Sequence, residues 1–156
     1  MAEVRMTVNG APVAADVPDD ALLLDVLREE AGCTSLREGC GVGVCGACTA
    51  IVDGLPISTC LALAGRYGGA AILTTEGLAP DDPVVQAFAT TGAMQCGYCT
   101  PGIVLMVHDL LDREPDPGPQ QIAACLAANT CRCGAYPELQ EAVRTARASR
   151  AQQAAS

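Results

Sequence analysis

The sequence predicts an α+β protein in which a small mixed sheet comes first and a group of helices follows. Three observations predict this order. Apolar residues alternate with polar ones near the N-terminus, the spacing becomes helical after the polar tract 74–83, and each half has its own set of four cysteines. Halves shorter than about 80 residues need a staple beyond their cores. We therefore expect two metal-stapled domains, 1–77 and 78–156.

The first domain is expected to consist mainly of short hairpins. Asn9-Gly10 and Asp53-Gly54 are strong signals for two-residue turns. Short apolar runs of strand-like composition flank both turns. The expected strands are residues 4–8, 13–17, 49–52, 57–60 and 71–73.

One helix is expected in the first domain and four in the second. Asp19 and Asp20 are expected to cap the first helix, in which Leu23, Val26 and Leu27 share one face. The helices of the second domain are expected to begin at Pro83 (capped by Asp82), Thr100, Gln120 and Pro137. An antiparallel arrangement of these four brings the two connections that contain cysteines to one end.

Composition excludes several classes of function. The 156 residues carry a net charge of −9 and contain no Lys, so a phosphate-binding surface for nucleic acid is excluded. No uninterrupted apolar run approaches the ~20 residues of a membrane span, and no signal peptide is visible. We expect a cytoplasmic protein. Its positive mean hydropathy of +0.27 indicates a large interface or a fold held by more than its core.

The first cysteine set has the spacing of a plant-type [2Fe–2S] site. Cys40, Cys45 and Cys48 lie on one Gly-rich loop, and Cys60 follows from the next segment. Glycines suit such a loop because they allow positive φ angles and bring backbone N–H groups close to sulfur. Zinc, and buried or disulfide-bonded cysteine, are the weaker alternatives.

The second set combines a C-x2-C pair with a C-x-C pair, formed by Cys96, Cys99, Cys131 and Cys133. Taken alone, this set favours zinc and iron–sulfur equally. Beside the first set it predicts a second cluster with four thiolate ligands. The two remaining cysteines, Cys33 and Cys125, are expected to be small buried residues.

Outside the cysteines, few residues are candidates for chemistry. The sequence shows no nucleophile–base pair and no paired carboxylates, so no catalytic residue is predicted. Gln95 precedes the second set, and its simplest interpretation is a local backbone cap. His108, the only histidine, lies on a predicted helix, where a packing role is expected.

Four motifs carry a resemblance to a known family: Glu38–Gly41, Cys45–Thr49, Gln95–Gly102 and Cys131–Tyr136. Together they resemble the iron–sulfur subunit of the xanthine oxidase family of molybdenum hydroxylases. That family includes the small subunits of carbon monoxide, nicotinate, quinoline, isoquinoline and aldehyde dehydrogenases. The resemblance extends over about residues 4–143.

The resemblance implies a plant-ferredoxin-like β-grasp domain followed by a four-helix bundle, each with one [2Fe–2S] cluster. It implies electron flow from molybdopterin, in its cytosine dinucleotide form, in a large subunit. The electrons pass through the second cluster and then the first to FAD in a medium subunit, or to another acceptor. It further implies a dimer of heterotrimers, with Gln95 and Cys133 facing the pterin and the loop 41–46 facing the flavin.

One departure and two alternatives accompany this interpretation. Val42 and Val44 stand where many relatives carry an acidic residue, which suggests a dry contact with a partner. A free-standing two-cluster ferredoxin is the main alternative, but the apolar composition argues against a freely diffusing shuttle. A zinc-stapled adaptor is the other, and a colourless, zinc-containing protein would support it.

Overall fold

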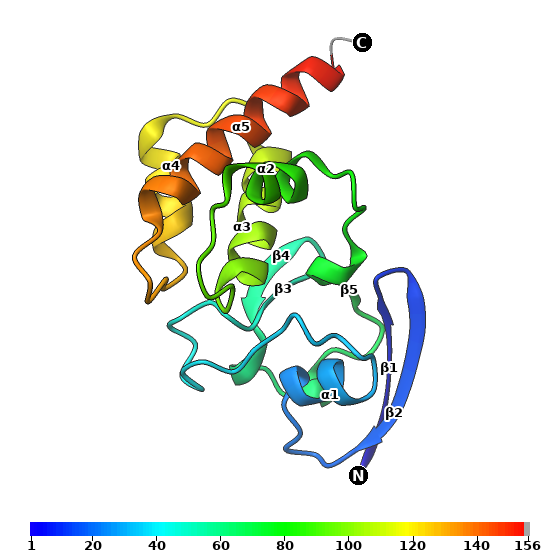
Figure 1. Cartoon of the computed structure of the whole chain (residues 1–156). Coiled ribbons are helices and arrows are strands. Elements are labelled where there is room, and N and C mark those ends of the chain that lie inside the picture. The colour runs from blue at the N-terminus through cyan, green and yellow to red at the C-terminus, as the bar shows by residue number, and fades with distance from the viewer. Residues whose placement is uncertain (155–156) are drawn as a thin grey trace.

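The computed structural model describes residues 1–154 and begins with a mixed five-stranded sheet (Figure 1). Its strands are β1 (Ala2–Val8), β2 (Ala11–Val17), β3 (Thr49–Val52), β4 (Leu55–Ser58) and β5 (Ala71–Leu73). Their order across the sheet is β2-β1-β5-β3-β4. The neighbours β1 and β5 are parallel, and the other neighbouring pairs are antiparallel.

Within residues 1–154, five α-helices accompany the sheet: α1 (Leu23–Glu29), α2 (Pro83–Thr91), α3 (Thr100–Arg113), α4 (Pro119–Ala127) and α5 (Tyr136–Ala154). Three short 3-10 turns, η1 (Thr59–Leu61), η2 (Ala64–Arg66) and η3 (Thr75–Gly77), lie in the connections. α2 packs against α5, and α3 contacts both α2 and α4. Figure 1 shows α2–α5 above the sheet and α1 in the lower part of the molecule, with the start of β1 and the end of α5 at opposite extremes. The α+β class is therefore confirmed.

Two separate groups of buried residues form the interior. In the first, α1 packs with the sheet, and the group includes Cys33, Cys48 and Cys60. The second is formed by α2–α5 around Phe88 and includes Cys131. Cysteines from both predicted ligand sets therefore lie in the cores, where a bound cluster would join the segments that carry them.

The first predicted hairpin is confirmed, and the second is shifted. Asn9 and Gly10 both have positive φ angles, as a two-residue hairpin turn requires. In the second hairpin, the two-residue turn places Val52 opposite Leu55, so β4 begins two residues earlier than expected. The predicted strand 57–60 therefore ends at Ser58, and Cys60 lies in the turn η1.

The predicted aspartate cap of α1 is wrong. The helix begins at Leu23, and its N-cap residue Leu22 makes no side-chain cap. Leu22 instead pairs with Leu63 in an isolated bridge, and the Leu23 N–H donates to the Ala62 carbonyl at 2.7 Å. Pairing with a distant segment thus takes the place of a local cap.

The helices of the second half begin close to their predicted positions. Asp82 caps α2 as expected, because its Oδ1 accepts a hydrogen bond from the Val84 N–H at 2.8 Å. α4 and α5 each begin one residue before the predicted start. No helix among the described residues is both long enough and apolar enough to cross a membrane.

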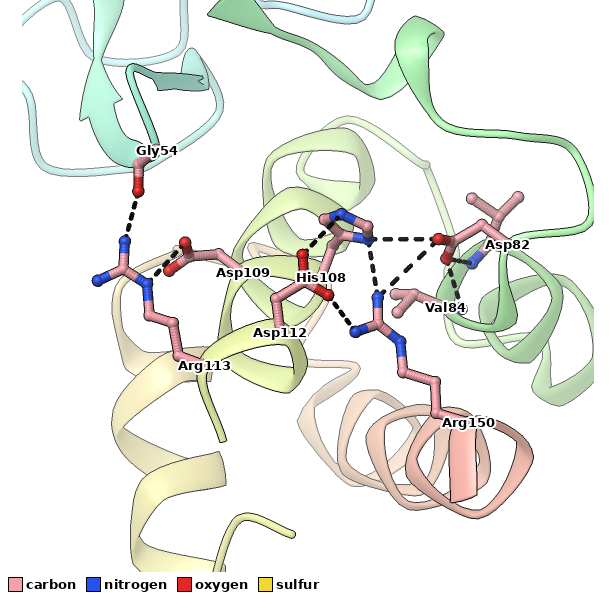
Figure 2. A network of polar contacts seen from close by, with 9 residues as sticks. Gly54, Asp82, Val84, His108, Asp109, Asp112, Arg113 and Arg150 are labelled. Carbon is pink, nitrogen blue, oxygen red and sulfur yellow. Dashed lines mark hydrogen bonds and ion pairs between the residues drawn. The ribbon is translucent and has the colours of Figure 1, made fainter. Parts of the chain in front are cut away.

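Polar contacts join the sheet to the helices and the helices to one another (Figure 2). Arg113 on α3 donates from Nη2 to the Gly54 carbonyl at 2.5 Å. His108, also on α3, lies between Asp82 at the start of α2 and Arg150 on α5. His108 therefore has the packing role that the sequence predicts.

Candidate metal centres

The first three cysteines lie on a loop with several positive φ angles, which favour glycine. Gly41, Gly43 and Gly46 have φ angles of 64°, 72° and 71°. At Gly43, a Cβ atom would also lie 2.4 Å from Cδ1 of Leu61, a residue of η1. The loop is thereby pressed against the turn that carries Cys60, which brings the fourth predicted ligand to the other three.

The backbone of this loop is arranged to stabilise a thiolate. The N–H groups of Val42, Val44 and Cys45 each donate to Cys40 Sγ, with N···S distances of 3.4 Å. These backbone hydrogen bonds lower the pKa of Cys40 to about 6. Because iron binds the thiolate, this geometry favours a metal ligand at Cys40.

In the first set, Cys48 and Cys60 are more buried than Cys40 and Cys45. Burial, and then the neighbouring thiols of Cys48 and Cys40, raise the pKa of Cys60 to about 11. Thr59 Oγ1 donates to the Cys48 carbonyl at 2.8 Å and fixes the backbone between them. Within the first set, Cys40 interacts with Cys45, and Cys60 interacts with Cys48 and, more weakly, with Cys40.

The second set is also divided into pairs. Cys96 and Cys99 lie between α2 and α3, and Cys131 and Cys133 lie between α4 and α5. The Tyr98 N–H and then the Cys133 thiol lower the pKa of Cys96. Burial and then the Cys131 thiol raise the pKa of Cys99 to about 12. Cys96 therefore interacts most strongly with Cys133, and Cys99 with Cys131.

Paired thiols distinguish a two-iron cluster from a single-ion site. Within residues 1–154, no three or more His, Cys, Asp or Glu side chains are grouped around a point where one metal ion would sit. A [2Fe–2S] cluster has two irons held by four thiolates, so each iron takes two of them. The strongest thiol interactions in each set, two by two, are compatible with that requirement.

The loops of the two sets contact each other directly, which the sequence did not reveal. Arg37 Nη1 donates to the Gly97 carbonyl at 2.7 Å, and its guanidinium lies over the Tyr98 ring, 5.3 Å from the centroid. The Tyr98 hydroxyl donates to the Glu38 carbonyl at 2.6 Å. The first loop is therefore docked on the segment that carries Cys96 and Cys99.

Gln95, Cys33 and Cys125 lie outside these pairs. Gln95 is exposed and makes no side-chain hydrogen bond within residues 1–154, so it caps no backbone group there. Cys33 and Cys125 are buried, as predicted, and burial raises the pKa of both, that of Cys125 to about 11.

Apolar side chains are exposed beside both sets. Near the first, Val42, Val44 and Leu61 expose 63%, 70% and 59% of their surface. Near the second, Met94 and Tyr98 are exposed, as are the sulfur-bearing residues Cys96 and Cys133. Each candidate centre thus has an apolar surface beside it.

Comparison with known proteins agrees with this geometry. Residues 6–66 match the family of 2Fe-2S iron-sulfur cluster binding domains, and residues 74–144 match the [2Fe-2S] binding domain family. The chain is 43% identical to the nicotinate dehydrogenase small FeS subunit of Eubacterium barkeri, over 92% of this chain and 93% of that one. It is 35% identical to the isoquinoline 1-oxidoreductase alpha chain of Brevundimonas diminuta, over 92% and 96% of the two chains.

Solved structures share the fold over nearly the whole chain. Quinoline 2-oxidoreductase from Pseudomonas putida matches with a TM-score of 0.90 and 34% identity, over 97% of this chain and 96% of that one. The aldehyde oxidoreductase from Desulfovibrio desulfuricans has the same TM-score and 38% identity, but this chain covers 17% of its length. The chain therefore belongs to the small iron–sulfur subunits of the xanthine oxidase family of molybdenum hydroxylases, whose role is electron transfer.

Proposed function

We propose that this chain takes electrons from a molybdopterin centre in a large subunit, and that it delivers them to FAD in a medium subunit. The contact between the two cysteine loops carries this proposal. Arg37 and Tyr98 join the loops directly, so two one-electron carriers would be held side by side. Exposed Cys96 and Cys133 supply an entry side, and exposed Val42 and Val44 supply an exit side.

The bound clusters would supply one-electron redox chemistry, and the chain would control where the charge settles. Eight thiolates would hold them: Cys40, Cys45, Cys48 and Cys60 in the first set, and Cys96, Cys99, Cys131 and Cys133 in the second. The three N–H donors at Cys40 Sγ stabilise negative charge there, which favours the reduced state of the first cluster. Backbone N–H groups also reach Cys96 and Cys131 of the second set, so such donors would favour the reduced state of both clusters.

Further assignments complete the proposal. Exposed Gln95 and Cys133 would face the pterin, in its cytosine dinucleotide form, and the loop 41–46 would face the flavin. Residues 1–77 would form a β-grasp domain, and residues 78–156 a four-helix bundle. The complex would be a cytoplasmic dimer of heterotrimers. The two separate cores and the exposed apolar residues support this organisation.

The test is quantified EPR of the anaerobically purified, dithionite-reduced protein. We expect two distinguishable S = 1/2 signals that sum to about two spins per chain. Cys99→Ser should remove one signal and leave the other. Cys125→Ser is the matched control, because it alters a buried thiol outside both sets and should leave both signals. A single signal in the wild-type protein, or zinc in the second set, would overturn the proposal.

A further inference from the structure

A buried asparagine joins the first cysteine loop to the segment that leads to Cys131. Asn129, whose surface is 1% exposed, donates from Nδ2 to the Gly46 carbonyl at 2.9 Å. Beside it, the Thr130 N–H donates to the Cys45 carbonyl at 2.9 Å. Cys45 belongs to the first set, and Thr130 directly precedes Cys131 of the second. One backbone hydrogen bond therefore connects a ligand of one set to the neighbour of a ligand of the other.

Asn129 is packed closely against the backbone of Gly46 and Gly102. A Cβ atom at Gly46 would lie 2.3 Å from Asn129 Nδ2. A Cβ atom at Gly102, in the first turn of α3, would lie 2.2 Å from the Gly46 carbonyl oxygen and 2.9 Å from Asn129 Nδ2. Three segments thus meet at Asn129: the first cysteine loop, the start of α3 after Cys99, and the chain before Cys131.

The Asn129 amide has a single possible orientation at this contact. Its Oδ1 is buried and has no hydrogen-bond partner among the described residues, which is a costly state for an acceptor. The amide cannot be turned over, because only its NH2 group can face the Gly46 carbonyl. The Gly46 carbonyl therefore fixes the orientation of the Asn129 amide.

We propose that Asn129 is a positioning residue for electron transfer between the two clusters, an inference that rests on the proposed function. It holds the first loop so that the Thr130–Cys45 hydrogen bond forms the connecting route. In each event one electron leaves the reduced second cluster, which becomes oxidised, and reduces the oxidised first cluster. No covalent bond changes. The other two contacts between the loops run through long side chains. Arg37 reaches the Gly97 carbonyl, between Cys96 and Cys99, and Tyr98 reaches the Glu38 carbonyl, before Cys40.

The test uses the holoprotein and the substitution Asn129→Asp, which keeps the size of the side chain and removes its donor. After pulsed reduction, rapid freeze-quench EPR should show electron exchange between the clusters slowed several-fold, with both signals present at full intensity. The spin–spin interaction of the fully reduced protein should weaken. Deuterium exchange at the Thr130 amide should become faster. Asn9→Asp is the control, because Asn9 is a hydrogen-bonded amide in the sheet domain, outside the contact between the cysteine loops.

The possible outcomes separate this inference from the proposed function. A wild-type protein without two clusters would overturn the proposed function itself. Wild-type exchange rate and spin–spin interaction in Asn129→Asp, with both clusters intact, would overturn only the role of Asn129. If Asn129→Asp does not retain both clusters, Gly102→Ala decides by the same two readouts, since its new Cβ displaces the Gly46 carbonyl while Asn129 remains.

Discussion

At the residue scale, the backbone of the loop around Cys40 binds the sulfur, while the valine side chains form the surface. The N–H groups of Val42 and Val44 point to the Cys40 sulfur, while their side chains are exposed to solvent. A substitution of either valine therefore changes the surface and keeps both donors. The thiolate depends on loop shape, which the glycine φ angles fix.

Glu76 lies in the connection between the two halves and contacts Ser35, which precedes the first cysteine loop. The charge of Glu76, and so this contact, depends on pH. Its carboxylate accepts hydrogen bonds from the Ser35 N–H at 2.7 Å, the Ser35 hydroxyl at 2.5 Å and the Thr74 hydroxyl at 2.6 Å. Burial alone raises the pKa of Glu76, but the hydrogen bonds from Ser35 and Thr74 outweigh it and lower the pKa.

We expect Glu76→Gln to reduce the free energy of unfolding at pH 7 by less than about 1 kcal/mol, because the carboxylate is exposed. Since folding lowers this pKa, the contribution is present above the unfolded value of about 4.3 and is lost as the pH falls through the folded value. Urea unfolding of both proteins between pH 7 and pH 3.5 measures the difference. Glu29→Gln, an exposed acid on α1, is the control, and an equal loss there would contradict the prediction.

The sequence reveals which residues are candidate ligands better than it reveals how they meet. The spacing of the cysteines in each set follows from the local loop that a cluster requires, so all eight could be named without a structure. The thiols that interact most strongly could not be predicted, because Cys99 and Cys131, for example, come from connections far apart in the chain. Asn129 also escaped notice, since a single polar residue shows no sign of the contact that buries it.

At the element scale, the sequence predicts the start of a helix correctly where neighbouring residues determine it. It fails where a distant segment determines it. Asp82 and Pro83 form a complete start signal within two residues, and α2 begins there. The start of α1 depends on the bridge between Leu22 and Leu63, which no local pattern contains. Propensity therefore predicted the apolar face of α1 but not its cap.

Asp82 also connects three helices, as Figure 2 shows. Besides capping α2, its carboxylate lies 3.3 Å from His108 Nδ1 on α3 and 3.9 Å from Arg150 Nη2 on α5. Arg150 in turn contacts Asp112 on α3. The cap thus holds the start of α2 to the two helices beside it.

Two substitutions at Asp82 separate these roles. Asparagine is as good an N-cap as aspartate, so Asp82→Asn should lose only the ionic contacts, about 1 kcal/mol or less. Asp82→Ala also loses the cap and should cost roughly 0.5–2 kcal/mol more. Chemical unfolding of the holoproteins, followed by circular dichroism, gives both values. Equal losses in the two variants would show that the cap contributes nothing.

At the scale of the whole molecule, the two centres lie in different halves that act as one unit. The first loop contacts the second half through Arg37, Tyr98 and Asn129, and α3 contacts β3. The composition indicated an interface, because the chain is apolar and has few charged residues. The composition could not show where this interface lies, since the exposure of a side chain depends on how the loops are folded.

The final prediction concerns the surface formed by Val42 and Val44. Burying a valine contributes about 1.5 kcal/mol or more, so each Val→Ser substitution should weaken binding to the proposed flavin subunit roughly tenfold. The N–H donors to Cys40 remain, so both EPR signals should be unchanged in Val42→Ser and Val44→Ser. Titration of the purified holoprotein with that subunit measures the dissociation constant.

Leu55→Ser is the matched control for this surface. Leu55 is 58% exposed, close to the value for Val42, but it lies at the start of β4 beside the Asp53-Gly54 turn. The substitution therefore removes a similar exposed apolar area at a different place. If Leu55→Ser weakens binding as much as the two valine variants, the flavin subunit docks over a different face. If the valine variants bind normally, the electrons leave the chain elsewhere, and the exposed valines are not the exit side.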